Sequence, residues 1–89
     1  MKAIVSVVGK DQVGIIAAVC NTLSAEQINV LDISQTILQD YFVMIMLTDL
    51  TACQTSFAKL SEELAAMGAA KGLDIRIQRE DIFNAMHRI

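Results

Sequence analysis

The chain has 89 residues, of which 54% are hydrophobic, and its formal net charge is −3. This length predicts one domain, and so many apolar residues in a small domain favour burial of some surface against another chain. The lysines and arginines are scattered and form no basic stripe, so the composition argues against nucleic-acid binding. The apolar N-terminal run ends at Gly9 and no stretch approaches the length of a membrane span, so we expect a cytoplasmic protein.

The first part of the chain predicts a strand and a helix. Residues 2–8 (KAIVSVV) are mostly β-branched and apolar, as in a strand at the centre of a sheet. From Val13 to about residue 26 the apolar residues recur at helical spacing. The expected buried stripe of this helix consists of Ile16, Val19, Cys20 and Leu23.

A hairpin follows, with a tight connection at Gln39–Asp40. Residues 28–38 place Leu31, Ile33 and Ile37 on one parity, and Asp32, Ser34 and Thr36 on the other. This pattern suits either an edge strand or a strand with one face exposed to water. Residues 41–48 are apolar on both parities, which predicts a central strand covered on both faces.

The second half predicts another helix, an edge strand and a short terminal helix. Thr51 and Gln54 have the spacing of a capping box, and Gly72 suits the left-handed residue after the last helical turn. Residues 73–80 alternate strictly between apolar and polar, as at a sheet edge. The core-facing side of the predicted second helix consists of Phe57, Leu60, Leu64 and Met67. The terminal segment, 81–89, carries Ile82, Phe83, Met86 and Ile89 on one helical face.

This order predicts an α+β fold, the ferredoxin-like βαββαβ sandwich, because apolar strands belong at the centre and half-polar strands at the edges. The antiparallel sheet then has the order 4-1-3-2, with both long helices on one face. We expect a domain over residues 1–80 and an amphipathic helix over 81–89 that packs on the domain or on a dimer. A C-terminal helix or a second subunit would cover the remaining apolar face.

Neither a metal site nor a catalytic site is indicated. His87 is the only histidine and has no Cys, Asp or Glu at ligand spacing, so we expect no metal or other cofactor. Cys20 and Cys53 show no CxxC spacing and suit reduced thiols. No serine or cysteine has a recognisable base beside it, and we expect no enzymatic activity.

The segment GKDQVG, residues 9–14, is the candidate site. If the helix starts at Gln12, Asp11 is its N-cap, and Gly14 lies in the first turn, where it leaves room above free backbone N–H groups. A helix N-terminus attracts a carboxylate, Asp11 can hold an ammonium group, and Asn29 can donate and accept hydrogen bonds. These positions could bind a zwitterion, or the segment could be a capped turn alone.

DQVGIIAAVCNTLSAEQINVLDISQT resembles the signature of ACT domains, with Val13 in place of the usual proline and Gln27 in place of the usual glycine. The strand order matches over residues 2–80, and the chain is similar to small bacterial single-ACT-domain proteins and to the ACT halves of glycine-cleavage regulatory proteins. A left-handed Gln27 would cost roughly 1–2 kcal/mol.

The resemblance implies a homodimeric, non-enzymatic regulatory protein that binds an amino acid or similar metabolite at a subunit interface and signals to a partner protein. It places the ligand at Asp11, Gln12, Val13, Gly14 and Asn29. The alternative is a dimerisation or protein-interaction module that binds no ligand.

Overall fold

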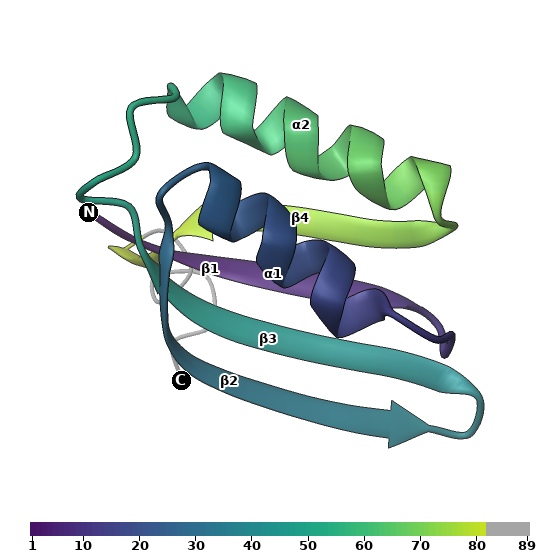
Figure 1. Ribbon diagram of the computed structural model, residues 1–89. Coiled ribbons are helices and arrows are strands. Elements are labelled where there is room, and N and C mark those ends of the chain that lie inside the picture. Colours follow the sequence, from purple (N-terminus) through teal and green to yellow (C-terminus); the bar gives the residue numbers. More distant parts are fainter. Residues whose placement is uncertain (82–89) are drawn as a thin grey trace.

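The computed structural model describes residues 1–81 of the chain. Its elements form the predicted βαββαβ order (Figure 1). The bounds are β1 Lys2–Lys10, α1 Ile15–Ala25, β2 Asn29–Leu38, β3 Tyr41–Asp49, α2 Phe57–Ala70 and β4 Leu73–Arg79.

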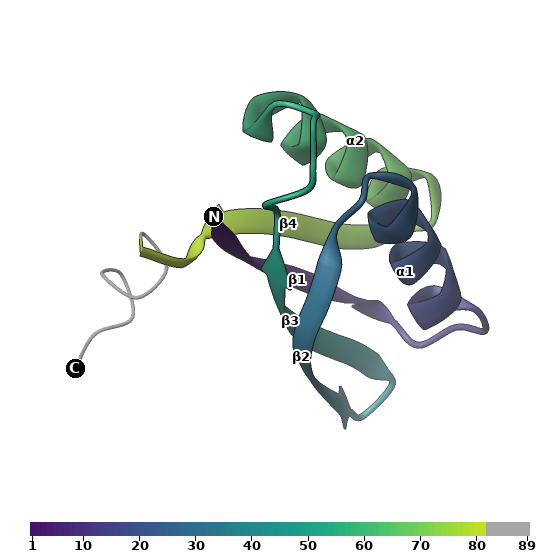
Figure 2. The same cartoon turned by 60° about the vertical axis from the view of Figure 1, so that its left-hand side comes forward.

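The four strands form one antiparallel sheet in the order β2-β3-β1-β4. This is the predicted order 4-1-3-2 read from the other edge, so the apolar strands β1 and β3 are central as expected. Both helices lie on the same face of the sheet (Figure 2). The expected terminal helix lies outside the described residues and stays a prediction.

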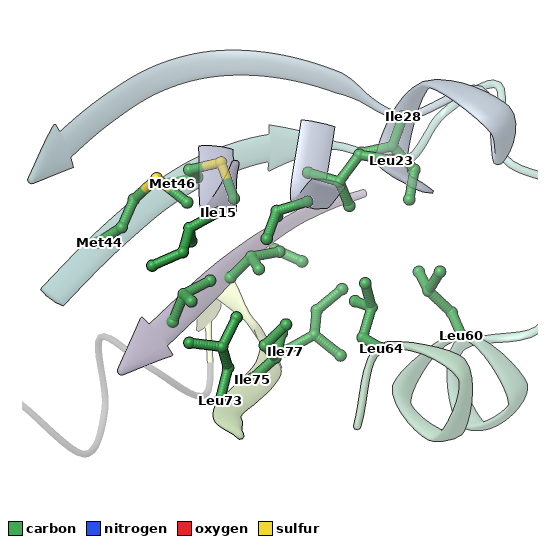
Figure 3. Packing of buried hydrophobic residues seen from close by; sticks show 14 of the residues in the cluster. Ile15, Leu23, Ile28, Met44, Met46, Leu60, Leu64, Leu73, Ile75 and Ile77 are labelled. Carbon is green, nitrogen blue, oxygen red and sulfur yellow. The ribbon is translucent and has the colours of Figure 1, made fainter. Parts of the chain in front are cut away.

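The core lies between the helices and one face of the sheet, where buried side chains of β1, β3, β4 and both helices meet (Figure 3). The α1 stripe differs from the prediction, because Ile15 is buried with Val19 and Leu23, whereas Ile16 is 40% exposed. The apolar surface of α1 is wider than the sheet beneath it can cover, so its flank stays open. The strand residues in the core include Val5, Val7, Met44, Met46, Leu73, Ile75 and Ile77.

The start of α2 also differs from the prediction. The helix begins at Phe57, and the Ser56 side chain caps it by accepting a 3.3 Å hydrogen bond from the Lys59 amide. The expected capping box is wrong, because Thr51 forms hydrogen bonds with a residue that precedes it in the chain and does not cap the helix. Its amide and its hydroxyl donate to the Asp49 carboxylate at 2.9 and 2.6 Å, which makes a turn after β3.

The end of α2 lies very close to β4. A Cβ atom on Gly68 would lie 2.8 Å from the Leu73 carbonyl oxygen and 2.9 Å from Ile75 Cγ1. Only glycine therefore permits this approach without a shift of the strand. Gly72 then leads into β4 with φ of 72°, as expected for the residue that ends the helix.

Candidate functional site

The loop Asp11–Gly14 joins β1 to α1 and ends in a left-handed glycine. Gly14 occupies the N-cap position with φ of 86°, and its carbonyl accepts the first helical hydrogen bond, from Ala18 N at 2.9 Å. The expectation that Asp11 caps the helix is therefore wrong. The left-handed turn delays the helix until Ile15, and Asp11 lies before that turn.

Hydrogen bonds tie this loop to two other turns at the same end of the sheet. The Asp11 amide donates to the Asp40 carbonyl at 2.9 Å, in the turn between β2 and β3. Gln12 Nε2 donates to the Lys71 carbonyl at 2.9 Å, just after α2. The sequence pattern gave no signal for the second bond, because its partners are far apart in the chain. The loop is thus held in place by backbone carbonyls.

The start of α1 is open above this loop. No side chain caps the helix, and its first turn contains no acidic residue. A Cβ atom built on Gly14 would have no neighbour within 4 Å, and Val13 is fully exposed. The N–H groups of a first helical turn have no partners within the helix, so they are available to an acceptor such as a carboxylate.

Asn29 lies at the opposite end of the sheet from this loop. It is the first residue of β2 and pairs with Asp49, the last residue of β3. The loop follows Lys10, which pairs with Tyr41, the first residue of β3. One chain therefore brings Asp11, Gln12, Val13 and Gly14 together but does not bring Asn29 to them.

Strand β2 is an edge strand with apolar side chains exposed on the helix side. A bulge falls between Val30 and Asp32, and beyond it Ile33 and Ile37 pair with core residues of β3. The two isoleucines therefore point to the helix side, yet they are 44% and 56% exposed because no described helix covers them. We call Val13, Ile16, Ile33 and Ile37 the β2-edge surface.

Asp49, which pairs with Asn29 across the sheet, has a displaced pKa. The Thr51 hydroxyl, and then the Thr51 amide, donate hydrogen bonds that lower the pKa of Asp49. The Asp49 side chain is thereby committed to the turn after β3. The turn does not use the side chain of Asn29, which lies at the same corner of the sheet.

The described residues contain no group of three or more His, Cys, Asp or Glu side chains that could hold a metal ion. Over the same range no helix is long and apolar enough to cross a membrane.

Known proteins resemble the chain over nearly its whole length. A family model described as ACT domain matches residues 2–78. A UPF0237 protein from Clostridium acetobutylicum is 56% identical over 89 residues, which covers all of both chains. An ACT domain protein from Streptococcus pneumoniae has a solved structure with a TM-score of 0.84, 40% identity and 98% coverage of each chain.

A more distant neighbour shares the fold alone. It is a putative glycine cleavage system transcriptional repressor, 20% identical, with a TM-score of 0.71 over 86% of this chain and 44% of its own. The family model covers nearly the whole chain, and the ACT domain protein from Streptococcus pneumoniae shares its fold. The chain belongs to the ACT-domain family.

Proposed function

We propose that this protein is a non-enzymatic regulatory module that binds an amino acid or a similarly small zwitterion between two copies of the chain. ACT domains are commonly regulatory domains that bind small molecules. The observation that carries the proposal is the open, uncapped start of α1 beside an unpaired, apolar sheet edge. The module would act in the cytoplasm, without a cofactor, by changing its contact with a partner protein.

The edge strand supplies the geometry of the proposed interface. Two β2 strands can pair antiparallel about a two-fold axis at Ser34, which keeps paired side chains on the same face of the sheet. Because the bulge leaves Leu31 as an extra residue, this pairing sets Asn29 of one copy opposite Leu38 of the other. Leu38 adjoins the turn whose Asp40 carbonyl holds Asp11. The seam therefore joins the two parts of the site that one chain keeps apart.

The same seam would cover the β2-edge surface. Val13, Ile16, Ile33 and Ile37 expose apolar area on the helix side, next to the strand whose backbone groups are unpaired. An exposed edge strand of this kind is a ready template for another strand. Burial of the isoleucines and pairing of the edge act together, which favours a homodimer.

Each part of a zwitterion has a chemically suitable group in this arrangement. The carboxylate fits the free N–H groups and the positive end of α1, above Gly14. The ammonium group fits the exposed Asp11 carboxylate. The amide of Asn29, from the second copy, can bond either group. Gln12 and Val13 would form the wall between them.

One set of observations favours the alternative, a dimerisation or interaction module that binds no ligand. The left-handed φ of Gly14 explains its glycine, and the bond from Gln12 to Lys71 explains the glutamine, with no ligand needed. In that case the β2 edge would still pair, and the loop would serve only to start α1.

A thermal-shift panel of amino acids separates the two functions. A ligand at a hundred times its Kd should stabilise the fold by about 2.7 kcal/mol, which is a rise of several degrees in Tm. If no amino acid shifts Tm while sedimentation still shows a dimer, the interaction module is the better function.

Variants then locate the site by calorimetric titration. Asp11→Asn should weaken amino acids but spare analogues without an ammonium group, and Asn29→Ala should weaken both. The matched controls are Glu62→Gln, at an exposed position of α2, and Asn21→Ala, at an exposed position of α1. Unchanged affinity in both site variants would contradict the proposed placement.

A further inference from the structure

The face of the sheet that points away from the helices is apolar, and no described element covers it. Neighbouring pairs across β1 and β3 dominate this face, among them Val8 with Val43 and Ile4 with Leu47. Val8 is 42% exposed and Ile45 is 43% exposed. The expectation that β3 is covered on both faces is therefore not met within residues 1–81. We call this the open face.

A shallow hollow of about 140 Å³ lies on the open face. It lies toward the end of the sheet where β1 begins and where β3 and β4 end. Its lining residue Ile4 pairs there with Leu47 on one side and with Gln78 on the other. Its wall is apolar except for one carboxyl and one hydroxyl group. The lining residues on this face are Ile4, Asp32, Ser34, Ile45 and Leu47, and Ile33, whose side chain points to the helix side, also borders the hollow.

The described chain ends at the same end of the sheet as this hollow. The last residue of β4, Arg79, pairs with Ala3, one row beyond the row that contains Ile4 and Leu47. The Arg79 guanidinium lies 3.1 Å from the Asp81 carboxylate. Residues that follow Asp81 therefore start at the same end of the sheet as the hollow, two strands away from it.

Residues 82–89 (IFNAMHRI) match the open face in length and in pattern. Eight residues make a helix of about 12 Å. Two steps between neighbouring strands cover about 10 Å, which is the distance from β4 across β1 to β3. Four large apolar residues share one side of such a helix. The four are Ile82, Phe83, Met86 and Ile89.

We propose that residues 82–89 form a helix that lies across the open face of its own chain, with Met86 and Ile89 over the hollow. The sheet then has helices on both faces, and its two central strands are covered as their apolar pattern requires. The covering segment comes from the same chain because it starts beside the surface that it covers. This proposal does not depend on the binding of any ligand.

Disulfide trapping in the full chain tests both the position and the origin of the helix. Ser6→Cys, between Ile45 and Arg76 in the sheet, is combined with Met86→Cys after both native cysteines are replaced by alanine. We expect a disulfide within one chain, seen as a monomer on a non-reducing gel. A disulfide-linked dimer would overturn the same-chain origin, and no disulfide would overturn the covering itself. Ser24→Cys on exposed α1 replaces Ser6→Cys as the control and should form none.

A thermodynamic cycle gives a second test that does not require new cysteines. Met86→Ala should lower Tm by on the order of 5 °C, and Ile45→Ala should add almost nothing to that loss because the two side chains share one contact. With Ile37→Ala, on the other side of the sheet, the losses should simply add. Additive losses for Met86 and Ile45 would contradict the proposal.

Discussion

Strands β4 and β2 are the two edge strands of one sheet, yet a helix of the chain covers the apolar side chains of only β4. β4 alternates between Leu73, Ile75 and Ile77, all buried under α2, and polar residues on the other side. β2 is interrupted by a bulge and keeps Ile33 and Ile37 exposed. Because a helix of the same chain covers the apolar side chains of β4, that edge strand has a structural role only. The apolar side chains of β2 are uncovered and form a surface suited to a partner.

The largest expected effect comes from truncating one isoleucine at each edge. Ile75→Ala should cost about 2–5 kcal/mol, because it leaves a cavity in the core. Ile37→Ala should cost less than about 0.5 kcal/mol in a monomer. Thermal unfolding at several protein concentrations sharpens the contrast. The cost of Ile37→Ala should grow with concentration if β2 pairs in a dimer, and the cost of Ile75→Ala should not. Equal costs at both edges would contradict the comparison.

A smaller effect is expected where α2 meets β4. Gly68→Ala places a Cβ atom 2.8 Å from a backbone carbonyl, so the strand or the helix must move. Helix propensity alone would favour alanine by about 1 kcal/mol, but overpacking should outweigh it and give a net loss of about 1–3 kcal/mol. Urea unfolding measures the change. Ala66→Gly on the exposed side of α2 measures the propensity alone, and a stabilised Gly68→Ala would show that β4 is loosely held.

The entries into the two edge strands differ by one residue type. Gly72 precedes β4 with φ of 72°, and Gln27 precedes β2 with φ of 61°. Because only the second position holds a side chain in this conformation, Gln27→Gly should stabilise the fold by about 1 kcal/mol. Gly72→Gln should destabilise it by a similar amount. Urea unfolding of the two variants checks the pair, and a loss of stability in Gln27→Gly would mean that its side chain has a structural role.

The smallest effect concerns pH at the start of β2. Thr51 holds the pKa of Asp49 below its ordinary value, so the folded state favours the charged carboxylate. This stability is complete above the pKa of the unfolded chain, about 3.9, and is lost as the pH falls through the lower folded value. Thr51→Val should therefore make the fold less dependent on pH between these two values. Acid titration followed by circular dichroism tests this, with Thr36→Val on exposed β2 as the control.

The sequence predicted the sheet order because the strands differ clearly in polarity, and it predicted the left-handed Gly72. It misplaced both helix starts, since Gly14 and Ser56 define them through local backbone geometry that apolar spacing does not record. It also assigned Ile16 to the core, where Ile15 lies instead. The distance between Asn29 and the loop follows from strand direction alone, and the residue types did not reveal it.

The pairing of β1 with β4 has a consequence for how the chain folds. β1 is the first strand and β4 the last, and their register joins Ala3 to Arg79 across nearly the whole described chain. The β2–β3 hairpin closes a turn of two residues and can form early. The pairing of β1 with β4 instead requires closure of a loop that contains nearly the whole described chain, and the entropy lost in that closure slows folding. During synthesis, we expect the finished sheet to wait until β4 has left the ribosome.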